Sequence, residues 1–93
     1  MAKLYIKRPY IIEAFQYDGK LRDDIGQWKI PLWAIDAWNA SEMFISEDDG
    51  ELYIETLEGV MHVSVGDYVI HGVRDEIYPC KEDVFRYTYA EVL

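Results

Sequence analysis

GELYIETLEGVMHVSVGDYVIHGV, residues 50–73, sets the architecture of this chain because it holds three strand-like runs at close intervals. The runs ELYIET, VMHVSV and YVIHGV are rich in the β-branched and aromatic residues that favour strands. TLEG at 56–59 and Gly66-Asp67 supply turns between them, and the DG pair at 49–50 signals a hairpin back to EMFIS at 42–46. The segment therefore predicts antiparallel strands joined by hairpins.

Similar patterns predict the elements outside this segment. IPLWAIDAWNASE, residues 30–42, indicates a helix with Pro31 at its first position and with Ala34, Ile35 and Trp38 on one face. Further strands are expected over 3–7 (KLYIK), 10–17 (YIIEAFQY), 76–80 (EIYPC) and 87–92 (YTYAEV), and a helical turn over 81–87. Residues 20–30 are ambiguous and could form one helical turn before Gly26. The chain thus predicts an α+β domain: a small, curled, mostly antiparallel and barrel-like β-sheet with one central helix and a short C-terminal helical turn.

Length and composition favour one soluble domain. A chain of 93 residues is too short for two independent cores, so residues 1–93 are expected to fold together. The composition, 51% hydrophobic and 15% aromatic, is that of a packed domain. No apolar run approaches the ~20 residues of a membrane span, and MAKLYIKRPY lacks the apolar core of a signal peptide. The single cysteine, Cys80, leaves no internal disulfide, which is typical of cytoplasmic proteins.

Negative charge is concentrated in the middle of the chain. The net charge is −9, and residues 30–73 carry nine acidic residues and no Lys or Arg. Residues 1–29 have six basic and four acidic residues (+2), and residues 74–93 have three and five (−2). Direct nucleic-acid binding is disfavoured, because phosphates are neutralised by clustered Lys and Arg. Two interpretations of the acidic segment stay open: a solvated face that maintains solubility, and a surface for a basic partner.

The motifs GELYIETLEG, VSVGDYVIHGV and EIYPCKEDVFRYTY together resemble a family of small phage and prophage proteins named after the pentapeptide PGDYG. KRPYIIEAFQYDG and IPLWAIDAW fill the places of that family's N-terminal strand and helix, so the resemblance covers essentially the whole chain. Val65 and Val69 replace the proline and the final glycine of the naming motif, and Glu82 replaces another proline. The resemblance implies action in the cytoplasm of a bacterial host cell. It implies no catalytic residue, because the family has no established activity.

Cys80, His62, His71 and Asp67 are the residues from which a catalytic or metal site could be built. No local signature supports a cysteine nucleophile, and Cys80 at a strand end is typical of a small buried residue. The histidine spacing matches no zinc pattern, and EDDGE at 47–51 lacks the spacing of a calcium loop. We therefore expect no metal, no cofactor and no enzymatic activity.

The strongest binding candidates are acidic. Glu51, Tyr53 and Glu55 are expected on one face of a strand, and carboxylates spread along such a ridge resemble backbone phosphates in sign and spacing. The predicted acidic ridge comprises Glu47, Asp48, Asp49, Glu51, Glu55 and Glu58. A separate pocket or interface is predicted from Asp67, Tyr68, Arg74 and Trp33. Gly66-Asp67 is nevertheless interpreted mainly as a turn lock, whose carboxylate accepts hydrogen bonds from turn amides.

These features favour a non-enzymatic phage accessory protein that binds and inhibits a bacterial host-defence protein. The partner would present a basic surface, as a restriction nuclease or a nucleic-acid-guided nuclease does, and neither nucleic acid nor a membrane is expected to bind directly. One alternative is a binding protein for a small ligand such as a nucleotide signal. Another is a structural or regulatory phage interaction module. An exposed strand edge would also allow a homodimer.

Overall fold

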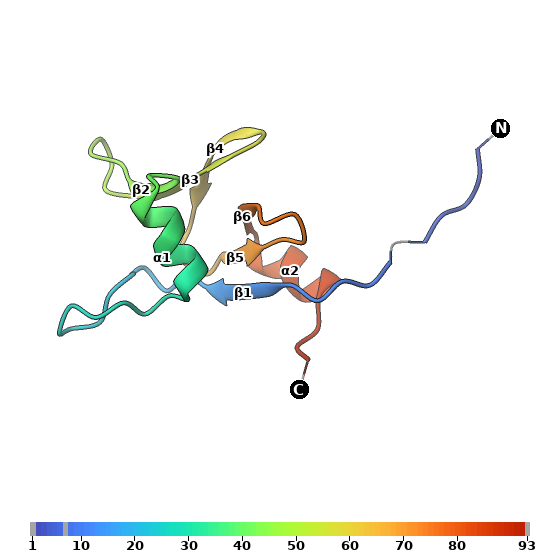
Figure 1. Cartoon of the computed structure of the whole chain (residues 1–93), viewed down its shortest axis with the longest axis horizontal. Helices are drawn as coiled ribbons and strands as arrows, with labels where there is room; N and C mark the ends of the chain where they lie inside the picture. Colours follow the sequence, from blue (N-terminus) through green and yellow to red (C-terminus); the bar gives the residue numbers. More distant parts are fainter. Residues whose placement is uncertain (1, 7, 93) are drawn as a thin grey trace.

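A computed structural model describes residues 2–6 and 8–92, which form six strands and two helices (Figure 1). In chain order the elements are β1 (Glu13–Gln16), α1 (Leu32–Asn39), β2 (Met43–Ile45), β3 (Leu52–Thr56), β4 (Gly59–Val63), β5 (Tyr68–His71), β6 (Ile77–Cys80) and α2 (Glu82–Thr88). Neither helix of this described part combines the length and the apolar character that crossing a bilayer requires.

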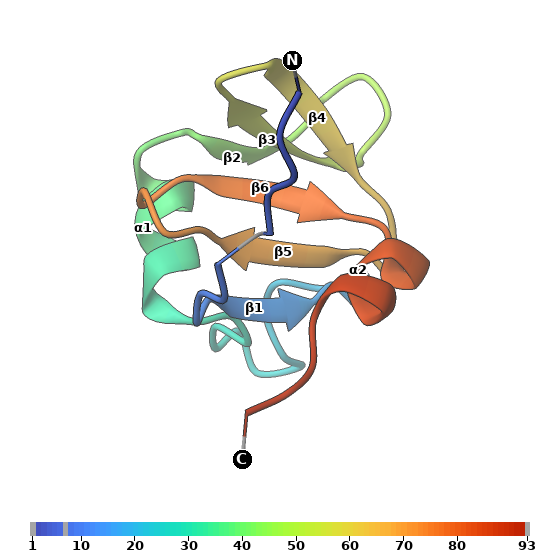
Figure 2. The same ribbon diagram turned by 90° about the vertical axis from the view of Figure 1, so that its right-hand side faces the viewer.

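The strands form two antiparallel sheets of three strands each, in the orders β1-β5-β6 and β2-β3-β4. The predicted α+β class and antiparallel pairing are confirmed, and the two helices lie where a helix and a terminal helical turn were predicted. The described strands form two sheets where one was predicted, and they close no barrel, so the predicted barrel-like curl is not confirmed. β6 contacts both β3 and β4, so the two sheets lie against each other (Figure 2).

β3 is the central strand of its sheet and shows the clearest alternation between buried and exposed side chains. Leu52 and Ile54 are buried, whereas Glu51 and Glu55 are exposed and Tyr53 is half-buried. Successive side chains of a strand point to opposite faces of the sheet. The predicted placement of two carboxylates and one tyrosine on the outer face is therefore confirmed.

α1 contributes one apolar face to the core. Pro31 is the N-cap residue rather than the first helical residue. Ala34 and Ala37 are buried, whereas Ile35 and Trp38, which were predicted to share the face of Ala34, are half-buried. Because alanine carries only a methyl group, the helix backbone packs close to the rest of the core. The core residues are Tyr17, Ile30, Ala34, Ala37, Met43, Leu52, Ile54, Val63 and Val69.

The turn at residues 64–67 carries the chain from one sheet to the other. Gly66 has a φ of +97°, which glycine adopts without steric cost. Tyr17 binds this turn with both backbone groups: its N–H donates to the carbonyl of Asp67, and its carbonyl accepts from the N–H of Gly66, both at 2.8 Å. The Asp67 carboxylate accepts a hydrogen bond from the Ser64 N–H at 2.9 Å. The predicted turn lock is confirmed.

Four segments differ from the sequence predictions. Residues 2–6 are exposed and form no strand, while Lys7 of the same predicted strand lies outside the described residues. The strand expected over 10–17 is confined to 13–16. Residues 20–30 form a loop closed by a bridge between Arg22 and Trp28, not a helical turn, and residues 89–92 form no strand. In both terminal segments the strand-like alternation finds no neighbouring strand within the described chain with which to pair.

Candidate functional site

The loop between β2 and β3 carries four acidic residues, Glu47, Asp48, Asp49 and Glu51, which we call the acidic hairpin. The Tyr53 hydroxyl donates to the Asp49 carboxylate, and the Glu51 N–H donates to Asp49 Oδ1 at 2.9 Å. These hydrogen bonds lower the pKa of Asp49, and the bond from Tyr53 makes the largest contribution. Asp49 therefore stays ionised at lower pH than an ordinary aspartate.

A row of aromatic rings lies beside the acidic hairpin, across the three strands of its sheet. The Tyr53 ring centroid is 5.9 Å from that of Phe44 and 5.2 Å from that of His62. His62 Nε2 lies 3.3 Å from Glu51 Oε1. Glu51 and Asp49 are thus held by neighbouring side chains, which reduces the entropy that a partner must remove on binding.

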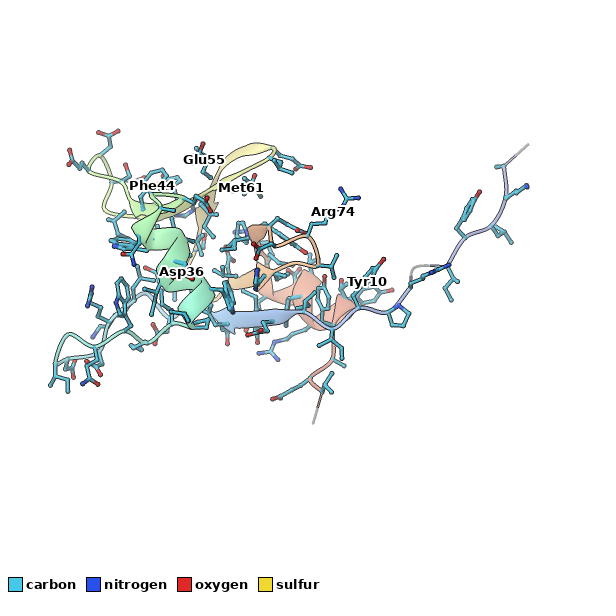
Figure 3. The ribbon with its side chains drawn as sticks, viewed as in Figure 1. Tyr10, Asp36, Phe44, Glu55, Met61 and Arg74 are labelled. Atoms are coloured by element: carbon cyan, nitrogen blue, oxygen red, sulfur yellow. The ribbon has the colours of Figure 1, made fainter. Side chains whose placement is uncertain are left out.

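A groove of about 780 Å³, which we call the acidic groove, lies at the other end of β3, between the β3–β4 turn and the β5–β6 turn. Figure 3 shows two of its lining residues, Glu55 and Met61, on the β3–β4 hairpin. The lining combines acidic groups with apolar groups. The acidic residues are Glu42, Glu55, Glu58, Asp75 and Glu76, and the apolar and aromatic ones are Leu57, Met61, Ile77 and Tyr78.

Strand pairing and a close turn place the carboxylates of this groove. The Glu55 N–H donates to the carbonyl of Glu42 at 2.7 Å, so these two residues enter from adjacent strands. The Glu76 side chain lies over Gly72, where a Cβ would overlap its carboxylate. Glu76 Oε2 is buried and has no hydrogen-bond partner within the described chain. The groove therefore holds a carboxylate oxygen that the described residues leave unsatisfied.

Nine carboxylates, four in the acidic hairpin and five in the acidic groove, form no ion pair with any described Lys or Arg, and two of them, Glu51 and Asp75, contact the side chains of His62 and His71. The ion pairs of described Lys and Arg residues are Lys20–Asp24, Lys29–Asp18, Lys81–Asp67 and Arg86–Glu82. Within residues 2–6 and 8–92, no three His, Cys, Asp or Glu side chains are grouped so that they could hold a metal ion. The negative charge is spread over the surface instead of being gathered around one point.

The pocket predicted from Asp67, Tyr68, Arg74 and Trp33 is not assembled. Tyr68 begins β5 and stacks on Phe85 of α2 with a centroid distance of 3.8 Å. Arg74 lies in the turn beyond the opposite end of β5. Asp67 is only 5% exposed and serves the turn between the sheets. Asp67 and Tyr68 therefore lie at one end of β5, whereas Arg74 and Trp33 lie toward its other end.

Trp33 is packed against the sheet at the His71 end of β5. Its ring stacks on His71 at 5.0 Å, and its Nε1 donates to Glu13 Oε2 at 3.2 Å. Trp38 contacts Trp28 edge-on, with centroids 6.0 Å apart. Both helical tryptophans are half-buried, so neither is a freely exposed anchor for a partner.

Cys80 and His71 lie at opposite ends of the β5–β6 hairpin, because Cys80 pairs with the first residue of β5 and His71 is the last. Burial raises the pKa of the Cys80 thiol, and the charges of Asp67 and Asp83 raise it further. A raised pKa lowers the thiolate fraction at neutral pH and with it the reactivity of the thiol.

Glu55 and Glu58 were predicted from the sequence, but the other acidic residues of the groove, Glu42, Asp75 and Glu76, were not. Glu42 reaches the groove through the register between β2 and β3, which no local pattern specifies. Asp75 and Glu76 reach it because β6 packs against β3 and β4. The acidic run at 75–76 was visible in the sequence, but its neighbours in space were not.

Tyr78 should report on the environment of this groove in a pH titration. Burial, a hydrogen bond with Tyr89 and the charge of Glu76 raise the pKa of Tyr78 to about 12. In the unfolded chain the Tyr78 phenol should ionise near pH ~10. The contribution of protonated Tyr78 to the stability of the fold is therefore fully present below that pH and is lost as the pH rises toward 12. Absorbance at 295 nm should show that Tyr78→Phe removes a late ionisation. If the difference between the wild-type and Tyr78→Phe titration curves is centred near pH ~10, this assignment is wrong.

Comparison with protein-family models, with curated proteins and with solved structures finds no match to this chain. The resemblance to PGDYG-type phage proteins thus rests on the sequence motifs alone.

Proposed function

We propose that this protein is a non-enzymatic binding protein whose acidic surface engages the basic surface of a partner protein. The observation that carries the proposal is the set of nine carboxylates in the acidic hairpin and the acidic groove, none of which is ion-paired with a described Lys or Arg. Ion pairs within one chain would neutralise such a surface. Carboxylates without these pairs attract cationic groups from outside and speed their encounter.

The acidic groove favours Lys and Arg side chains over small cations. Five of its lining residues are acidic, while Leu57, Met61 and Ile77 contribute apolar surface. The long stems of Lys and Arg pack on apolar surface while their charged ends reach carboxylates. An anionic nucleotide finds no Lys or Arg among the lining residues of this groove, so the small-ligand alternative gains no support from it.

The resemblance to phage proteins suggests a bacterial host-defence protein as the partner, and a nuclease fits this surface well. Glu51 and Glu55 lie on one face of the strand, four residues or ~13 Å apart at the usual rise of a strand. The acidic hairpin adds further carboxylates beyond Glu51. Such a series spans a distance comparable to several phosphates of a nucleic-acid strand. In this proposal the protein inhibits the nuclease by occupying its nucleic-acid channel.

The quadruple variant Glu47→Gln, Asp48→Asn, Glu55→Gln and Glu58→Gln should lose partner binding and keep its fold. Asp49 is left unchanged because its carboxylate orders the loop through the Glu51 N–H. We expect affinity to fall at least about tenfold, or ~1.4 kcal/mol. The measurement is capture of a host protein at low salt on immobilised wild-type and variant chains, followed by affinity measurement on the captured protein.

A variant with the same charge change elsewhere provides the control. Asp24→Asn, Asp36→Asn, Asp83→Asn and Glu91→Gln also remove four negative charges, from exposed positions outside the acidic hairpin and the acidic groove. This control should bind like the wild type. Salt and duplex DNA should both release the captured protein if the carboxylates take the place of phosphates. Equal binding by the two quadruple variants would show that net charge alone, and not this surface, governs the interaction.

A further inference from the structure

The N-terminal segment 2–12, which we call the arm, leads away from the folded body in its described residues, 2–6 and 8–12 (Figure 1). Leu4, Tyr5 and Ile6 are each at least 90% exposed, and Ile11 is 82% exposed. The described residues of the arm belong to neither sheet. Monomeric proteins rarely leave several large apolar side chains of one segment in water, so this segment has the character of an interaction element.

The arm has the chemistry of a basic strand. Leu4 and Ile6 alternate with Lys3 and Tyr5, as they would in a strand with one buried face. The segment also carries Arg8, and Lys7 adds a third basic residue to the sequence, although it lies outside the described residues. No acidic residue occurs before Glu13, so the arm has a charge of +3 from its side chains.

The acidic groove has the complementary chemistry. It combines five carboxylates with apolar lining residues and contains no Lys or Arg among its lining residues. Leu57 and Met61 of its lining are themselves exposed. Leu4 and Ile6 can cover this apolar surface, while Lys3 and Arg8 pair with carboxylates of the groove.

The position of the arm favours the groove of another molecule over its own. Ile11 and Ile12 line a second hollow together with Phe85 and Arg86 of α2, which fixes the base of the arm there. Pro9 keeps the residue before it extended, so the chain continues outward from this point. The long dimension of the molecule, 54 Å against 32 and 23 Å, reflects this projection (Figure 1).

From this complementarity we infer that the arm of one copy docks in the acidic groove of a second copy, which gives a two-fold, arm-exchanged homodimer. Each copy then supplies one arm and receives one, so the contact is isologous and closed. This inference goes beyond the proposed function, because it requires no other protein. The two proposals share the acidic groove, whereas the acidic hairpin belongs to the proposed function alone and stays free for a partner in the dimer.

A charge exchange between two variants tests the inference. In the arm variant, Lys3→Glu and Arg8→Glu should weaken self-association at least tenfold; in the groove variant, Glu55→Lys and Glu58→Lys should do the same. An equimolar mixture should recover a dimer containing one copy of each, because the two reversed positions of the arm then face the two reversed positions of the groove with opposite charge, and the unchanged arm meets the unchanged groove. Sedimentation velocity over roughly 1 µM to 1 mM measures the dissociation constants.

Two further variants make the result specific. Leu4→Ser with Ile6→Ser should weaken the dimer as well, because it removes the apolar contact without changing the charge. Glu47→Lys with Asp48→Lys, which carries the same charge change as the groove variant, should leave the dimer intact and weaken only partner binding. All these positions are exposed, and circular dichroism confirms that each variant is folded.

Three outcomes would overturn the inference. A wild-type chain that stays monomeric over the whole concentration range excludes the dimer. Arm and groove variants that each remain fully dimeric place the interface elsewhere. A mixture of the two variants that stays monomeric, although each variant has lost self-association, shows that arm and groove are not partners. None of these outcomes bears on the Glu47 and Asp48 test of partner binding, so the two proposals fail separately.

Discussion

Replacing Ile54 by alanine should lower the free energy of unfolding by about 2–5 kcal/mol, which is a large part of the ~5–15 kcal/mol that stabilises a typical domain. Ile54 is 0% exposed at the centre of β3. It pairs with Met43 on one side and with Met61 on the other. β3 also contacts β6 of the second sheet, so a cavity at this position loosens the contact between the sheets. Guanidinium unfolding, followed by tryptophan fluorescence, measures the loss.

Ile45→Ala provides the matched control for this substitution. Ile45 lies in β2 of the same sheet but is 40% exposed, so its side chain already contacts water and leaves a smaller cavity. We expect a loss of less than about 1.5 kcal/mol for Ile45→Ala. Similar losses for the two variants would mean that Ile54 is not the packing centre described above.

The hairpins could be predicted from the sequence because their turns are encoded locally. The TLEG run contains Gly59, whose φ of +110° suits glycine, and it joins β3 to β4 as expected. The division into two sheets could not be predicted in this way. It depends on the pairing of β1 with β5, in which Phe15 lies opposite Val69 across more than fifty residues of sequence. No local pattern encodes such a distant contact, and burial of the shared core decides it.

The arm shows why an alternating pattern can mislead. Leu4 and Ile6 alternate with polar neighbours as in a strand, yet the described residues 2–6 form none. A strand requires hydrogen bonds from a neighbouring strand, and periodicity reports only which face would be apolar. If the arm docks in a second copy, its alternation describes a contact between molecules and not one within the chain.

Only the part of the candidate site that depends on local turn signals could be predicted from the sequence. Glu47, Asp48 and Asp49 surround a turn signal, so their place at a hairpin tip followed from the sequence. The acidic groove depends on strand register and on the packing of β6 against the other sheet, which brings Asp75 and Glu76 to it. Local charge density therefore revealed the acidic hairpin, whereas only the tertiary structure revealed the groove.

Asp67→Ala should destabilise the protein by about 1–3 kcal/mol, because it leaves the Ser64 N–H without its side-chain acceptor in the turn that joins the two sheets. Asp67→Asn should cost less, since the amide oxygen can still accept from Ser64. What Asn loses is the ion pair with Lys81 at 3.2 Å, and because Lys81 is largely exposed this pair contributes little. Asp24→Ala, at an exposed loop position, should change stability by no more than about 0.5 kcal/mol.

The order of the three variants decides between two roles for Asp67. If Asp67 acts as a turn lock, urea unfolding should find Asp67→Ala the least stable variant, Asp67→Asn intermediate, and Asp24→Ala as stable as the wild type. If Asp67 instead belongs to a binding surface, Asp67→Ala should weaken partner binding without lowering the stability of the fold. The side chain is only 5% exposed, and the same turn is bound by both backbone groups of Tyr17. We therefore expect the order of stabilities given for a turn lock. Partner binding should change only to the extent that the turn at residues 64–67 between the two sheets is loosened.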